Sequence, residues 1–264
     1  MKETGLNFRP ALPNALTMTA LAFGVSSLNM AFWGQWKMAV LFIILSALFD
    51  FFDGKVARML GVSSKFGAEL DSLSDFVSFG VAPGFLMYQW TMDPSMRIDV
   101  LKNLAIRSEA VGVYWIFVLF LAMCCAARLA RFNTMLDKKL PPYWTHFFMG
   151  VPAPAGAFLA ILPMILWFAG GESCSLLKNP VIVGSFLVFS GVMMASKVPT
   201  ICLKHIHLNN RHRTIAMILF LIFIAILVTT PFIALGIAGL SYLVSIPIGV
   251  WYFIRQRGAY FKKK

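Results

Sequence analysis

Residues 38–58 read MAVLFIILSALFDFFDGKVAR, a long apolar run that ends in two aspartates, Asp50 and Asp53. A helix needs about 20 residues to cross the roughly 30 Å hydrocarbon core of a bilayer. The stretch therefore predicts a membrane-spanning helix over 37–57 whose last turns carry acidic side chains.

The whole chain has this apolar character: 59% of its residues are hydrophobic, 13% are charged, and the mean hydropathy is +0.77. Soluble domains are about 45–50% apolar and about 25% charged. We therefore predict an all-α, polytopic membrane helical bundle of about eight transmembrane helices. The runs are too long and continuous for the alternating strands of a membrane barrel. The predicted spans are 12–33, 37–57, 71–90, 111–131, 147–169, 180–200, 214–232 and 234–254.

We expect these helices to form a single domain over 1–264. Its core covers about 10–205, and a C-terminal helical hairpin covers about 214–254, with a tight turn near Pro231–Gly236. The net charge of +12 comes mostly from basic residues between the apolar runs. Such residues orient membrane proteins and attract anionic lipids, so nucleic-acid binding is not expected. Their bias places both termini in the cytoplasm.

Two pairs of aspartates lie on either side of the junction between the second and third predicted spans. Asp50 and Asp53 share one helix face at i and i+3, and Asp71 and Asp75 share another at i and i+4. The segment 55–65 is short enough to turn the chain back. We therefore expect four carboxylates to converge near the membrane surface.

Such a cluster is costly, because one aspartate at the bilayer centre costs about 2.5–3.5 kcal/mol. The acids would have to share protons or bind cations. Helix capping does not explain them, since a helix dipole disfavours anions at its C-terminal turn. Oxygen-only ligands without His or Cys favour Mg²⁺, Mn²⁺ or Ca²⁺, and four carboxylates suit a two-metal site that clamps a phosphoryl group.

Small and basic residues accompany the acids. Gly54, Ala57 and Gly67 leave room for a phosphate or nucleotide to approach the backbone. Arg58, Lys65 and Ser64 would supply positive charge and hydrogen bonds to phosphate oxygens. The pattern therefore predicts a nucleotide-diphosphate site.

The spacing D-x2-D-G-x2-A-R-x8-G-x3-D-x3-D, which runs from Asp50 to Asp75, resembles the signature of the CDP-alcohol phosphotransferase family. The resemblance implies an enzyme in which a hydroxyl attacks the β-phosphorus of a CDP-linked donor and CMP leaves. It implies that Asp50, Asp53 and Asp71 hold Mg²⁺ or Mn²⁺, and that Asp75 completes the site and acts as general base. It further implies that Gly54, Arg58 and Ser64 bind the donor.

Further stretches narrow the substrates. Pro13-Asn14-Ala15-Leu16-Thr17 resembles the family's entry to the first span, which makes Asn14 and Thr17 candidate cytidine contacts; an N-cap and a packing threonine are the alternative reading. The stretches around Arg128, Arg131 and Lys197 resemble the branch that joins CDP-diacylglycerol to L-serine. These three cations could bind the serine carboxylate, or they could be membrane anchors.

Several alternatives stay open. Glycerol 3-phosphate or an inositol derivative would also need cations, and choline is a further acceptor of the family. From a different class, a divalent-cation transporter could also place carboxylates in a membrane, although such sites usually lie near the midplane. The resemblance carries the expectation of a homodimer in a bacterial or archaeal cell membrane, with its active site at the cytoplasmic face.

Overall fold

The computed structural model describes residues 11–62, 64–93, 107–135, 141, 144, 147–201 and 210–262. The chain divides into two compact units, Met1–Leu129 and Ala130–Lys264. The described part of the chain is almost entirely helical, which confirms the all-α class. The division into units leaves the single-domain expectation a prediction.

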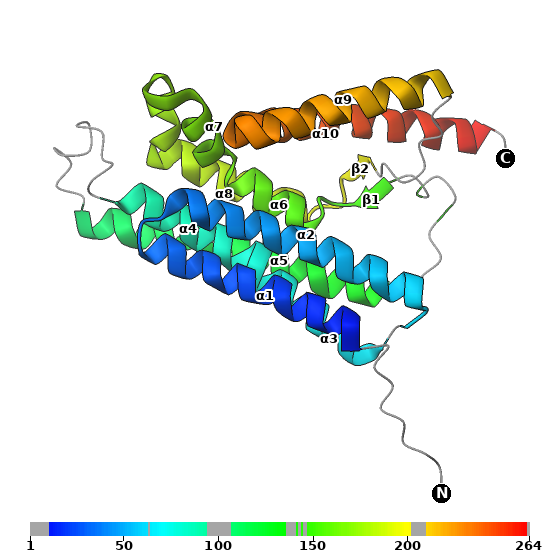
Figure 1. Cartoon of the computed structure of the whole chain (residues 1–264), viewed down its shortest axis with the longest axis horizontal. Coiled ribbons are helices and arrows are strands. Elements are labelled where there is room, and N and C mark those ends of the chain that lie inside the picture. Colours follow the sequence, from blue (N-terminus) through cyan, green and yellow to red (C-terminus); the bar gives the residue numbers. More distant parts are fainter. Residues whose placement is uncertain are drawn as a thin grey trace, which may run out of the picture. The chain divides into compact units, whose positions relative to one another are not determined.

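In the first unit, α1 (Ala11–Phe32) and α2 (Trp36–Leu60) lie side by side, joined by a turn at Gly34 (Figure 1). Two serine hydroxyls join these helices. Ser27 Oγ donates to the Ala39 carbonyl over 3.0 Å, and Ser46 Oγ donates to the Ala20 carbonyl over 2.8 Å. Satisfying hydroxyls across helices in this way suits an apolar environment. α1 and α2 match the first two predicted spans within a few residues.

The third predicted span, 71–90, consists of three consecutive pieces: α3 (Lys65–Asp75), a π-helix η1 (Phe76–Val81) and α4 (Ala82–Met92). Gly24 of α1 lies against η1. A Cβ atom added to Gly24 would lie 2.9 Å from the Ser78 Cα atom, so only glycine permits this approach. π-Helical turns frequently occur at functional sites, and this one follows directly after Asp75.

The helix α5 (Arg107–Met135) contains the boundary between the two units. It packs on the α3–α4 segment through small residues. A Cβ atom on Gly80 would lie 3.0 Å from Cys125 Cβ, and one on Gly84 would lie 3.0 Å from Val118 Cγ1. These contacts hold α5, which carries Arg128, against η1 and α4, the pieces that follow Asp75.

The second unit contains a feature that the sequence did not predict, a short antiparallel pair of strands. β1 (Phe147–Met149) pairs with β2 (Pro199–Ile201), so the predicted helical spans 147–169 and 180–200 were wrong at one end each. The described helices there are α6 (Ala153–Ala160), α7 (Leu162–Gly170), the 3-10 helix η5 (Gly171–Lys178) and α8 (Pro180–Ala195). Pro152 caps the start of α6 and Pro163 lies in the first turn of α7, positions that suit proline because no helical N–H is needed there. Pro199 begins β2.

The chain ends in a hairpin of α9 (Asn210–Thr229) and α10 (Pro231–Lys262), which lie side by side (Figure 1). The hairpin was predicted; its turn lies at Thr230, slightly before the predicted position. Pro231 begins α10, where the missing N–H of proline costs nothing.

Among the described residues, three helices are long and apolar enough to cross a membrane: Ala11–Phe32, Tyr114–Met135 and Pro231–Gly258. The bent pair α6 and α7, with 48° between them, would make a fourth. The chain is thus an integral membrane protein, whereas the number of eight spans and the cytoplasmic termini stay predictions.

Candidate active site

A tight turn brings the two acidic segments together, as the sequence predicted. α2 ends at Gly61, whose φ of 62° is left-handed, and the Val62 N–H donates to the Ala57 carbonyl over 3.0 Å. This is the usual glycine-based ending of a helix. Ser64 then caps α3, since its Oγ accepts a hydrogen bond from the Gly67 N–H over 2.9 Å.

The four aspartates gather between α2 and α3. One carboxylate oxygen from each of Asp50, Asp53 and Asp71 lies within 4.8 Å of the other two. The Asp50 carboxyl also lies within hydrogen-bonding reach of Asp71 and of Asp75. The predicted convergence is therefore confirmed for Asp50, Asp53 and Asp71.

The donor set fits a divalent cation. Asp53 is only 5% exposed and Asp50 and Asp71 are half-buried, and carboxylates at this spacing repel one another unless they share a proton or bind positive charge. All of the donors are oxygen atoms, which are the ligands of Mg²⁺, Mn²⁺ and Ca²⁺. The cluster can thus hold a metal ion.

The sequence pattern placed Asp50 and Asp53 in the last turns of a helix, where the helix dipole would disfavour them, and this reason was wrong. α2 continues to Leu60, so Asp53 lies about two turns before its end, beyond the reach of a terminal dipole. Burial and mutual repulsion, rather than the dipole, make these acids unfavourable without a cation.

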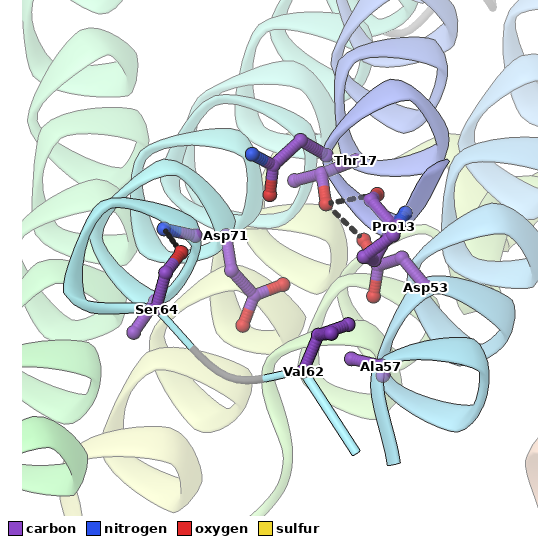
Figure 2. Close-up of a pocket in the computed structure, with 11 residues that line it drawn as sticks. Pro13, Thr17, Asp53, Ala57, Val62, Ser64 and Asp71 are labelled. Atoms are coloured by element: carbon purple, nitrogen blue, oxygen red, sulfur yellow. Dashed lines mark hydrogen bonds between the residues drawn. The ribbon is translucent and has the colours of Figure 1, made fainter. Parts of the chain in front are cut away.

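A cavity of about 190 Å³ lies beside the cluster, and Figure 2 shows the carboxyl groups of Asp53 and Asp71 at its edge. Its volume is below the roughly 300 Å³ of a typical ligand pocket, so it can enclose a small group or only part of a larger ligand. The lining residues are Pro13, Asn14, Thr17, Asp53, Gly54, Ala57, Val62, Ser64, Gly67, Ala68 and Asp71.

The two predicted glycines serve different purposes in this cavity. A Cβ atom on Gly54 would have only Arg58 Nη2 nearby, at 4.0 Å, so the space beside Gly54 is open to a ligand. A Cβ atom on Gly67 would lie 3.1 Å from both Asn14 Oδ1 and Ser64 Oγ, so Gly67 permits the approach of α1 to α3. Arg58 and Lys65 are exposed near this opening, on α2 and α3.

Thr17 occupies a position that the sequence prediction did not foresee. Its Oγ1 lies 2.6 Å from Asp53 Oδ2 and 3.1 Å from the Pro13 carbonyl (Figure 2). Sequence reasoning also missed Pro13, Val62 and Ala68 as lining residues. Pro13 lies inside the stretch that suggested Asn14 and Thr17, but Val62 and Ala68 have no chemical signal that would single them out.

The three predicted acceptor-binding cations have different surroundings. The charge of Arg128 acts on Asp50, Asp71 and Asp75. Arg131, in the second unit, donates to the carbonyls of Ala195, Met194 and Ser196, over 2.6, 3.2 and 3.0 Å. Lys197 is exposed. Arg128 belongs to the same unit as the aspartates and interacts with them through its charge, whereas Arg131 and Lys197 belong to the second unit.

Fold and site together define a helical integral membrane protein with an acidic, metal-competent cluster beside a small cavity. Residues 10–202 match the CDP-alcohol phosphatidyltransferase family, and the chain belongs to this family. Residues 211–247 match a second family description, CDP-alcohol phosphatidyltransferase 2.

Curated relatives have one name in common. The chain is 31% identical to the CDP-diacylglycerol–serine O-phosphatidyltransferase of Mycobacterium leprae, over 90% of this chain and 74% of that protein. It is 32% identical to the protein of the same name from Helicobacter pylori, over 96% and 95% of the two chains. A protein of that name from Methanocaldococcus jannaschii is 36% identical over 59% of this chain and 60% of its own length. The family predicted from the sequence is thereby confirmed.

Proposed function

We propose that this protein is a CDP-diacylglycerol–serine O-phosphatidyltransferase, which makes phosphatidylserine and CMP. The observation that carries the proposal is the position of Asp53 and Asp71 in the lining of a cavity that leaves free space for a ligand beside Gly54. The names of the relatives from Mycobacterium leprae and Helicobacter pylori support serine as the acceptor.

In this proposal, Asp50, Asp53, Asp71 and Asp75 hold two Mg²⁺ or Mn²⁺ ions. Bound divalent ions would stabilise the negative charge on the phosphoryl oxygens and orient the donor. The proximity of three carboxylate oxygens within 4.8 Å supports this ligand set.

The transfer is a displacement at the β-phosphorus of CDP-diacylglycerol. The serine hydroxyl oxygen forms a bond to phosphorus, the bond from phosphorus to the bridging oxygen breaks, and CMP leaves with that oxygen. Asp75 accepts the hydroxyl proton as general base. Its place beside Asp50, one turn along α3 from Asp71, supports this assignment.

The cavity binds the CDP part of the donor, whose acyl chains stay outside because the volume is small. We assign Asn14, Thr17, Gly54, Ala57, Ser64 and Gly67 to its wall, and Arg58 and Lys65 to the phosphate charges; the first six line the cavity. Ser64 Oγ already accepts from the Gly67 N–H, which leaves its own O–H to donate to a phosphate oxygen.

Arg128 is the strongest candidate for the serine carboxylate, because its charge already acts on the aspartates. Lys197 stays a prediction for this role, and so does Arg131, although its bonds to the carbonyls of Ala195, Met194 and Ser196 favour a structural role instead. We further propose that the site faces the cytoplasm of a bacterial or archaeal cell and that the enzyme is a homodimer, as the basic residues and the family resemblance suggest.

An acceptor panel tests the proposal. The full-length protein, purified in detergent, receives CDP-diacylglycerol, Mn²⁺ or Mg²⁺, and one alcohol at a time: L-serine, glycerol 3-phosphate, inositol or choline. We expect CMP release with serine alone, its loss with a chelator, and its loss in Asp71→Asn. CMP release with glycerol 3-phosphate alone would exclude serine. No CMP with any alcohol would exclude the enzyme, and the cation transporter would then be tested by Mn²⁺ uptake into vesicles.

A further inference from the structure

Thr17 connects α1 to the acidic cluster through its side chain. The residue is only 5% exposed, and its Oγ1 lies 2.6 Å from Asp53 Oδ2 (Figure 2). A hydroxyl has one proton to donate, and the second nearby acceptor is the Pro13 carbonyl at 3.1 Å. An ionised carboxylate is the stronger acceptor, so the proton belongs on the bond to Asp53.

The backbone of the same residue connects α1 to the other acidic helix. Ser74 lies between Asp71 and Asp75 on α3, is 3% exposed, and donates from Oγ to the Thr17 carbonyl over 3.3 Å. Thr17 therefore contacts α2 through its hydroxyl and α3 through its carbonyl. One residue of α1 is thus hydrogen-bonded to both helices that supply carboxylates.

We infer that Thr17 is a positioning residue, which orients the Asp53 carboxylate for a divalent cation before the cation arrives. This inference rests on the proposed function for the metal and the four aspartates, and it gives Thr17, in addition to its place in the cavity wall, a role toward the metal ligand Asp53. A hydrogen bond to one oxygen fixes the rotation of the carboxyl group, and such outer partners of metal ligands typically change metal affinity about 10–100-fold.

The residue type suits this role. Threonine is branched at Cβ and has few rotamers in a helix, mainly those that allow Oγ1 to reach the carbonyl four residues earlier. In Thr17 this conformation also presents Oγ1 to Asp53. Serine would keep the hydroxyl but lose the restriction, and valine would keep the shape but lose the hydroxyl.

Direct Mn²⁺ binding tests the inference without any lipid chemistry. The full-length protein in detergent is titrated with Mn²⁺, and free Mn²⁺ is measured by electron paramagnetic resonance. We expect Thr17→Val to weaken Mn²⁺ binding about 10-fold or more and Thr17→Ser to restore most of it. The matched control is Thr19→Val, because Thr19 donates to the Ala15 carbonyl over 2.8 Å in the same helix but is bonded to no acid.

Each outcome decides the matter. Unchanged Mn²⁺ affinity in Thr17→Val, with a raised KM for CDP-diacylglycerol, would overturn the inference and make Thr17 a nucleotide contact. An equal loss in Thr19→Val would assign the effect to general packing of α1, and a wild type that binds no Mn²⁺ would also overturn it. The acceptor panel decides the proposed function separately, since a protein whose Mn²⁺ affinity depends on Thr17 but which releases no CMP would refute only that function.

Discussion

The C-terminal half of α2 carries acids that lie close to other acids, whereas the C-terminal end of α8 is bonded by a cation. A helix leaves its last four carbonyls without partners in the helix. At the end of α8 all four are bonded: Val192 by Ser196 N–H, Met193 by Val151 N–H, and Met194 and Ala195 by the Arg131 guanidinium. The positive charge there meets carbonyl oxygens, as the helix dipole favours.

α2 ends with an ordinary glycine turn, yet two turns earlier it buries an acid that faces other acids. Asp53 is 5% exposed, and Asp50, Asp53 and Asp71 converge within 4.8 Å. The difference teaches that a charge which completes the backbone hydrogen bonding supports the fold, whereas a cluster of like charges around a buried acid indicates a ligand.

The largest effect should come from Asp75→Asn, which separates function from stability at the acidic cluster. We expect kcat for CMP release to fall about 10²–10⁴-fold through loss of the base. The melting temperature in detergent with a chelator should not fall, because one of several repelling acids is lost. Both quantities are measured on purified protein. Glu69→Gln, an exposed acid on the same helix, is the control and should change neither. Near-normal turnover in Asp75→Asn would remove Asp75 as the base.

The next largest effect should come from Arg131→Met at the end of α8. Three carbonyls lose a charged donor, so we expect the free energy of unfolding to fall by about 2–3 kcal/mol. The KM for serine of the folded enzyme should not change, whereas Arg128→Met should raise it. Denaturant unfolding in detergent and the serine dependence of CMP release measure the two effects. A raised KM without loss of stability would instead place Arg131 in the acceptor site.

Much of the site could be predicted from the sequence because it is local. Asp50, Asp53, Asp71 and Asp75 lie within two helices and one turn, so helical periodicity alone gives their faces, and Gly61 confirms the turn. The family followed from the same 26 positions and was confirmed over residues 10–202.

Features that depend on distant contacts could not be predicted. The bond from Thr17 to Asp53 joins residues 36 positions apart, and the bond from Arg131 to Ala195 joins residues 64 apart. The strands β1 and β2 are only three residues long, too short to show the alternation that reveals a strand. The close approach of α1 to the π-helix at Phe76–Val81 likewise depends on Gly24, which is distant in sequence.

The smallest effect is expected at two glycines, Gly54 on α2 and Gly150 beside the end of α8, which should respond differently to alanine. Gly54→Ala adds a methyl group whose nearest neighbour, Arg58 Nη2, is 4.0 Å away, so helix propensity should raise stability by about 0.5–1 kcal/mol. The same methyl group enters the cavity, and the KM for CDP-diacylglycerol should rise about tenfold.

Gly150→Ala is the contrasting control. Gly150 has a φ of +80°, and a Cβ there would lie 2.7 Å from the Ser196 carbonyl oxygen, so stability should fall without a change in KM. Unfolding in detergent and donor titrations measure both variants. If Gly54→Ala lowered stability and left the KM for CDP-diacylglycerol unchanged, Gly54 would be a packing glycine like Gly150. The free space beside Gly54 would then not bind the donor.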